Sequence, residues 1–152
     1  MGFEKNPLLN NIGKEQEKKN FSIYDLESGA KVKVNTKEFY PEGGEEKLDE
    51  SKAVILLPGW EAEPNDKTTM LLGKEFANCS TQKTYAINSE IDKDSIKDKQ
   101  NIDIFYEESM ATSKYIKSKG IKEIKIVGYS IGGDRAMSLA YILQNDQDII
   151  VD

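Results

Sequence analysis

The strongest constraint on the fold is an alternation of strand-like and helix-like segments along the chain. Residues 53–57 (AVILL) form a continuous apolar run that Pro58 and Gly59 end, which predicts a strand buried on both faces. Strands that alternate with helices form a parallel sheet with helices on its faces. The further predicted strands are 84–88, 121–127 and 148–151, and the helices are one from about residue 66, one at 101–119 and one at 134–143. We therefore expect an α/β protein, a three-layer sandwich around a mostly parallel central sheet.

Local signals place the ends and buried faces of these helices. Asn65 or Asp66 is a suitable N-cap for the first helix, and Gly120 supplies a left-handed terminator for the second. The stripe expected to face the core of the first helix comprises Met70, Leu71, Leu72, Phe76 and Cys79, and that of the second comprises Phe105, Thr112, Tyr115 and Ile116. Cys79 is expected to be a small buried hydrophobe, and Tyr85, Tyr106 and Tyr115 are expected at the edge of the core.

The N-terminal part has a different character. Residues 1–20 are polar and lack sustained periodicity, so they are predicted to be a mobile leader before a domain that spans 21–152. Apolar positions in 21–26 and 31–40 flank Ser28 and Gly29, a pattern typical of a hairpin. Residues 41–50 are predicted to be a solvated loop.

Composition excludes several classes of function. The chain has 21 Lys and Arg against 27 Asp and Glu, a net charge of -6, so it lacks the basic surface of a nucleic-acid binder. It contains neither an apolar run long enough to span a membrane nor a signal peptide, which favours a cytoplasmic protein. A single cysteine excludes an intrachain disulfide, and zero histidines exclude any imidazole base or metal ligand among the 152 residues. No metal or cofactor is expected, and the acidic stretch 61–66 is interpreted as solvated surface.

One short motif carries chemistry. Residues 128–132 (GYSIG) match G-x-S-x-G between a predicted strand and a predicted helix. A serine at the apex of such a turn sits in a strained backbone, which flanking glycines allow by letting the chain fold sharply. Its hydroxyl then projects from the carboxyl edge of the sheet, beside the N–H groups of a helix N-terminus. Ser130 is therefore the candidate nucleophile.

The segments IKIVGYSIGG at this turn and AVILLPGW upstream resemble the α/β-hydrolase family of serine esterases, lipases and thioesterases. The resemblance implies that Ser130 attacks a small-molecule acyl substrate and that the backbone N–H groups of Ile131 and Trp60 bind the oxyanion. It also implies that Gly128, Gly132 and Gly133 are the glycines of the elbow. Many relatives have His-Gly where this chain has Pro58-Gly59.

The resemblance covers residues 21–152 and stops before the family's histidine base and its acid. It therefore implies a partial domain, truncated before the last strands of the sheet, and an inactive chain when alone.

Three other interpretations of the motif remain open. Gly128 and Gly133 occupy the outer positions of the dinucleotide fingerprint G-x-G-x-x-G, and Asp152 lies at a suitable distance, but Ser130 replaces the middle glycine. The chain could also be a noncatalytic binding module on a hydrolase scaffold. In the simplest case, the glycines only allow a helix to pack closely on the sheet.

Overall fold

The computed structural model describes residues 21–43, 48–59, 64 and 66–152, so the predicted leader lies outside the described residues. Six strands form one sheet in the order β1-β2-β4-β3-β5-β6. The strands are β1 (Phe21–Asp25), β2 (Lys31–Phe39), β3 (Lys52–Leu57), β4 (Lys83–Ile91), β5 (Glu123–Gly128) and β6 (Ile150–Val151). The helices are α2 (Lys67–Ser80), the short 3₁₀ helix η2 (Lys93–Ile96), α3 (Ile104–Ser118) and α4 (Ile131–Gln144).

The sheet combines a hairpin with a parallel region. β1 and β2 pair antiparallel, with Gly29 at φ 88° in their turn, and this confirms the predicted hairpin. β2 also runs antiparallel to β4, whereas β4, β3, β5 and β6 are mutually parallel. The expected α/β architecture with a mostly parallel sheet is therefore confirmed.

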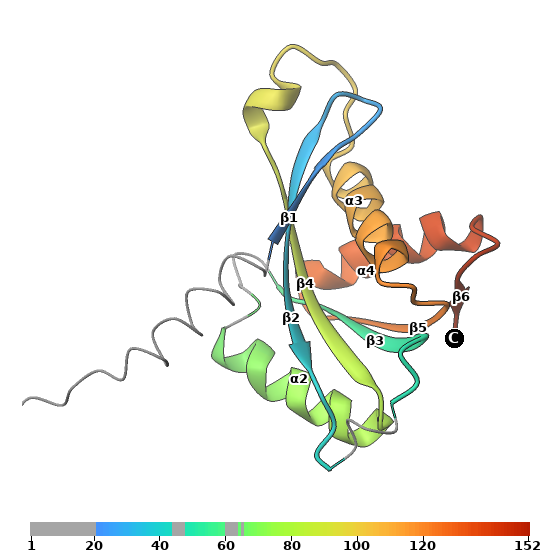
Figure 1. Cartoon of the computed structure of the whole chain (residues 1–152). Coiled ribbons are helices and arrows are strands. Elements are labelled where there is room, and N and C mark those ends of the chain that lie inside the picture. The colour runs from blue at the N-terminus through green and yellow to red at the C-terminus, as the bar shows by residue number, and fades with distance from the viewer. Residues whose placement is uncertain (1–20, 44–47, 60–63, 65) are drawn as a thin grey trace, which may run out of the picture.

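Helices cover both faces of the sheet (Figure 1). The chain steps from β3 to β4 in one direction and from β4 past β3 to β5 in the other. Because parallel crossovers are right-handed, steps in opposite directions place their helices on opposite faces. α2 accordingly packs on one face, while α3 and α4 pack against each other on the opposite face.

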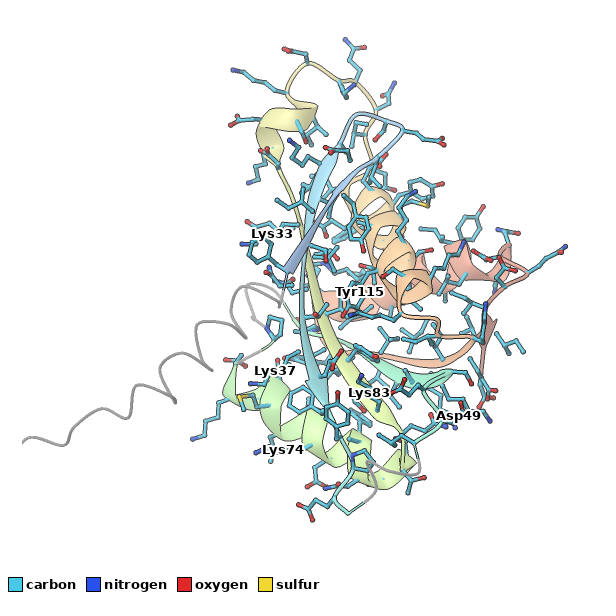
Figure 2. The ribbon with its side chains drawn as sticks, viewed as in Figure 1. Lys33, Lys37, Asp49, Lys74, Lys83 and Tyr115 are labelled. Atoms are coloured by element: carbon cyan, nitrogen blue, oxygen red, sulfur yellow. The ribbon has the colours of Figure 1, made fainter. Side chains whose placement is uncertain are left out.

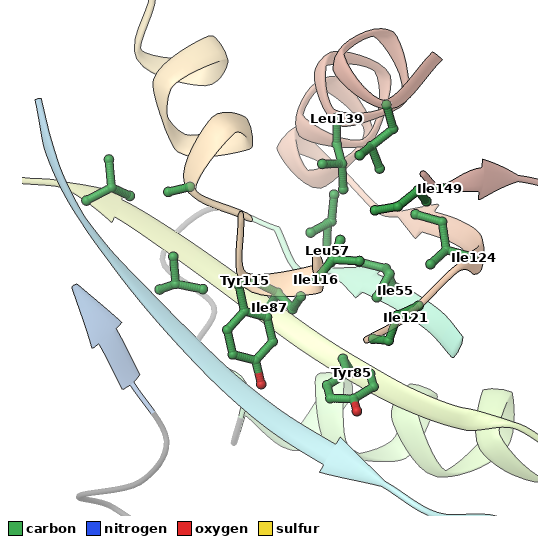
Figure 3. Close-up of a cluster of buried hydrophobic side chains, with 14 of the residues drawn as sticks. Ile55, Leu57, Tyr85, Ile87, Tyr115, Ile116, Ile121, Ile124, Leu139 and Ile149 are labelled. Carbon is green, nitrogen blue, oxygen red and sulfur yellow. The ribbon is translucent and has the colours of Figure 1, made fainter. Parts of the chain in front are cut away.

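The larger core lies between the sheet and the α3–α4 pair (Figure 3). All five residues of the predicted buried strand, 53–57, are buried. Tyr115 points from α3 toward the sheet (Figure 2) and its hydroxyl donates a hydrogen bond to Thr36 Oγ1 at 3.2 Å. The bulky members of this core are Leu26, Ile55, Leu57, Tyr85, Ile87, Ile91, Tyr115, Ile116, Ile121, Ile124, Leu139, Leu143 and Ile149.

The buried face of α2 differs from the predicted stripe. Its buried residues are Thr69, Gly73 and Ala77, because the Phe39 ring packs so closely on Gly73 that an added Cβ would lie 2.4 Å from it. Leu72, Phe76 and Met70 flank this stripe and are partly buried. The prediction that Cys79 is buried is wrong, because Cys79 is exposed, and Leu71 is 63% exposed.

Several boundaries also differ. β4 is longer than predicted because its residues 84–91 pair with β2 along their whole length. α4 begins at Ile131 rather than Asp134, since the turn after β5 runs directly into the helix. Tyr106 is 43% exposed, so its expected place at the core edge is wrong. Gly120, at φ 72°, follows α3 as predicted.

None of the helices in the described part of the chain has the length and apolar character needed to span a lipid bilayer.

Candidate active site

The end of β3 lies beside the end of β5. In the parallel register, Leu57 pairs with Gly128, so the chain leaves both strands at the same edge of the sheet. The connection from β3 leads to β4, on one side, and that from β5 leads to β6, on the other. Where neighbouring connections diverge in this way, a crevice opens at the carboxyl ends of the strands. The residues after Leu57 and after Gly128 therefore meet at the position where α/β sheets bind ligands.

Ser130 has a strained backbone at this edge. Its φ is 56° and its ψ is -132°, a conformation that non-glycine residues rarely adopt. It occupies the N-cap position of α4, yet its side chain makes no capping hydrogen bond to that helix. The residue is exposed. The fold thus presents the Ser130 hydroxyl to solvent instead of using it as a helix cap.

Gly128 and Gly132 allow this turn because main-chain atoms approach them too closely to leave room for a side chain. A Cβ at Gly128 would lie 2.1 Å from the Gly132 carbonyl oxygen, and one at Gly132 would lie 2.1 Å from the Leu57 carbonyl oxygen. Neither glycine has a positive φ, so the absence of a side chain is what matters at both positions. A Cβ at Gly133 would meet no atom of the described residues within 4 Å.

The N–H groups that start α4 do not all have an acceptor in the part of the chain that the structure describes. Those of Gly132 and Gly133 donate to the carbonyls of Tyr129 and Ser130, at 3.0 and 2.9 Å. The N–H of Ile131 has no acceptor among the described residues. This donor directly follows Ser130 at a helix N-terminus, where the helix dipole favours negative charge.

Gly59, two residues after the end of β3, lies beside the candidate nucleophile. A Cβ at Gly59 would lie 3.3 Å from Ser130 Cβ, so the two backbones approach closely. Trp60, the second predicted donor, lies outside the described residues.

A buried ion pair that the sequence pattern does not reveal joins α3 to α4. Arg135 Nε of α4 faces Glu108 Oε2 of α3 at 3.2 Å, although the two atoms are not aligned for a hydrogen bond. Arg135 Nη1 donates to Asn88 Oδ1 at 3.2 Å. Burial raises the pKa of Glu108, and the nearby Arg135 charge offsets only part of this effect. A charged residue in a helix normally signals a solvated face, so periodicity alone could not reveal the pair.

A small cavity adjoins the pair, between the sheet and the α3–α4 layer. Its volume of about 10 Å³ has room for roughly one water molecule. The lining residues are Leu57, Ile87, Ser89, Glu108, Ser109, Thr112, Arg135 and Leu139. Ser130 does not line it, so this cavity is separate from the candidate nucleophile.

Among the described residues, the polar groups found at this edge are the Ser130 hydroxyl and the N–H groups that follow it. The 152 residues contain no histidine to accept the serine proton. Within the described ranges, no group of three or more Cys, Asp or Glu residues is placed to hold a metal ion. Among the described residues, the edge thus places an exposed serine hydroxyl directly before the N–H of Ile131 at the start of α4.

No protein-family model matches the sequence, and no curated protein matches it. Solved structures do match its fold. Est1E from Butyrivibrio proteoclasticus is 19% identical with a TM-score of 0.55, over 86% of this chain and 48% of that chain. A structure titled as ferulic acid bound to Est1E gives 19% identity and a TM-score of 0.55, over 78% of this chain and 46% of that chain.

A probable hydrolytic enzyme from Pseudomonas aeruginosa is 14% identical with a TM-score of 0.55, over 85% of this chain and 38% of that chain. The chain thus spans about half or less of the length of the solved structures it matches. The sheet, its helices and these similarities together show that the chain has an α/β-hydrolase fold.

Proposed function

We propose that this chain supplies the nucleophile and oxyanion-binding part of a serine hydrolase that cleaves a carboxylic ester, thioester or related acyl bond. The observation that carries the proposal is the strained Ser130 backbone, which exposes the hydroxyl at the N-terminus of α4 beside the end of β3. A fold maintains such strain only where the surrounding structure enforces it, and such residues cluster at functional sites.

The proposed reaction follows from the groups at this edge. A base takes the Ser130 proton while the oxygen attacks the acyl carbonyl carbon, and the former carbonyl oxygen becomes an oxyanion. The N–H of Ile131, which has no acceptor among the described residues, stabilises that oxyanion, with the N–H of Trp60 as the predicted second donor. As the intermediate collapses, the bond to the leaving group breaks, the base returns the proton to it, and the alcohol or thiol departs from the acyl-Ser130 ester. Water then attacks this ester, giving up a proton to the base, and releases the carboxylic acid and Ser130. Because the sequence contains no histidine, the base and its acid partner are proposed to come from outside these 152 residues.

Acylation of Ser130 with added imidazole tests this function. Imidazole replaces the missing base, p-nitrophenyl acetate supplies the acyl group, and peptide mass spectrometry locates the product. A feruloyl ester is a second probe, since a matching structure holds ferulic acid. We expect Ser130 to be acylated roughly 10² times faster than other exposed serines, the effect of one oxyanion donor.

Ser118 is the internal control in the same sample. It is exposed like Ser130 but lies at the last residue of α3, where the helix dipole disfavours an anion. The Ser130→Ala variant should lose the fast adduct. Equal acylation of Ser118 and Ser130 would overturn the proposal.

A noncatalytic binding module is the second candidate, and the absence of histidine favours it. In that case the same edge binds a ligand without covalent chemistry. Binding of acetate or ferulate at Gly59 and Ile131, detected by amide chemical shifts, without acylation of Ser130, would support this candidate.

A further inference from the structure

Tyr129 contacts residues on both sides of the β3–α2 connection. Its backbone N–H donates to the carbonyl of Leu57, the last residue of β3, at 3.4 Å. Its ring lies against Gly59, where an added Cβ would be 3.3 Å from Tyr129 Cε2. Its hydroxyl forms a 2.9 Å hydrogen bond with Oγ1 of Thr69, in the first turn of α2. One residue, directly before Ser130, thereby joins the end of β3 to the start of α2.

Thr69, the hydrogen-bond partner of the Tyr129 hydroxyl, is fully buried. Thr69 has no exposed surface, so water cannot replace a lost partner of its hydroxyl, and an unpaired buried hydroxyl is unfavourable. The other buried members of this stripe of α2, Gly73 and Ala77, carry no polar side-chain atom. The hydrogen bond between Tyr129 and Thr69 therefore specifies the position of the turn at Ser130 relative to α2. Apolar packing alone does not specify this position.

We propose that Tyr129 is a positioning residue that holds Gly59 beside Ser130 through its ring contact and its hydrogen bond to Thr69. The proposal rests on the proposed function, because the spacing matters only if the oxyanion forms between the Ser130 elbow and the end of β3. Small displacements of reacting groups reduce rates strongly, so loss of the bond is expected to slow acylation without unfolding the protein.

The experiment compares Tyr129→Phe and Thr69→Val, each of which removes one hydroxyl and preserves the side-chain shape. The full 152-residue chain is acylated with p-nitrophenyl acetate and imidazole, and the rate at Ser130 is measured across ester concentrations. The amide signal of Gly59 is followed by NMR. We expect each variant to slow the maximal acylation rate about tenfold and to shift the Gly59 signal. The double variant should be no slower than either single variant, since both remove the same bond.

Two controls separate positioning from a general structural effect. Tyr115→Phe also removes the hydroxyl of a buried tyrosine, whose partner is Thr36, and should leave both readouts unchanged. Thr69→Ser retains a hydroxyl and should restore the rate and the Gly59 signal. Either wild-type acylation or an unchanged Gly59 signal in Tyr129→Phe would overturn the proposal, as would an equal loss in Tyr115→Phe.

The two proposals fail in different ways. If Ser130→Ala is acylated as much as the wild type, the proposed function fails, while the Gly59 signal still decides whether Tyr129 positions that residue. If Ser130→Ala loses the adduct and Tyr129→Phe keeps the full rate, only the positioning role fails.

Discussion

At the scale of single residues, the edge of the sheet depends on backbone geometry that only certain side chains permit. Ser130 adopts a strained φ and ψ, and Gly128 and Gly132 allow main-chain atoms to meet where a Cβ would collide. Gly133 belongs to the same short run of sequence but has open space at its Cβ position. Adjacent glycines in one motif thus have different physical roles.

Gly132→Ala and Gly133→Ala form a matched pair that tests this difference. An alanine at 132 would place Cβ 2.1 Å from the Leu57 carbonyl oxygen, so the backbone must move and the free energy of unfolding should fall by at least about 2 kcal/mol. An alanine at 133 would place its Cβ within 4 Å of no atom in the described part of the chain and favours the helix, so stability should rise by about 0.5–1 kcal/mol. Urea unfolding measures both, and equal losses would contradict the close-approach explanation.

At the scale of helices and strands, polar contacts join α3 to α4 and to the sheet. Glu108 and Arg135 pair inside the α3–α4 layer, and Lys117 and Asp146 pair where α3 ends and the residues after α4 begin. Glu108 and Arg135 have side chains only 7% and 15% exposed, so either charge would be costly if its partner were removed. These contacts fix the orientation of α4, whose N-terminus carries Ser130.

Arg135→Met is expected to destabilise the protein in a pH-dependent way. At neutral pH it leaves the Glu108 carboxylate buried without its cation, a loss of about 3–5 kcal/mol. Burial already raises the folded-state pKa of Glu108 above its unfolded value, and removal of Arg135 raises it further. Because the folded state then binds the proton more tightly, the variant recovers stability as pH falls through that raised pKa toward the ordinary glutamate value.

Chemical unfolding measured from pH 8 down to pH 5 should therefore show that the difference in free energy of unfolding between Arg135→Met and the wild type becomes smaller. The double variant Glu108→Gln, Arg135→Met removes both charges and should lose this pH dependence. If the loss of unfolding free energy in Arg135→Met stays constant with pH, the buried Glu108 carboxylate is not its cause.

At the scale of the whole molecule, the β6 end of the sheet carries exposed apolar side chains. Met137 and Tyr141 of α4 are 73% and 65% exposed, and Ile150 of β6 is 63% exposed. β6 pairs with β5 on one side and with no other described strand. Open strand edges and exposed apolar surface promote association between molecules.

We expect the 152-residue chain to associate as its concentration rises, and Tyr141→Lys combined with Ile150→Lys to reduce this association. Leu71→Lys is the matched control, because Leu71 is also 63% exposed but lies on α2, on the face opposite α4. Sedimentation velocity across a concentration series measures the effect. A wild-type chain that stays monomeric throughout, or an equal effect of Leu71→Lys, would contradict a role for the β6 end.

Local sequence patterns determined the order of strands and helices and the position of the elbow. The apolar run 53–57, the terminator Gly120 and the motif around Ser130 act over a few neighbouring residues, and such signals can be recognised without tertiary contacts. The class of sheet followed from their alternation.

Tertiary structure alone decided which distant residues meet. The sheet order brings Leu57 beside Gly128, and the buried face of α2 follows Gly73 because the Phe39 ring needs that space. The hydrogen bond of Tyr129 to Thr69 and the buried Glu108–Arg135 pair likewise join separate elements. The physical reason is that burial and pairing depend on what packs against a residue, and partners far apart in sequence leave no periodic signal in either segment.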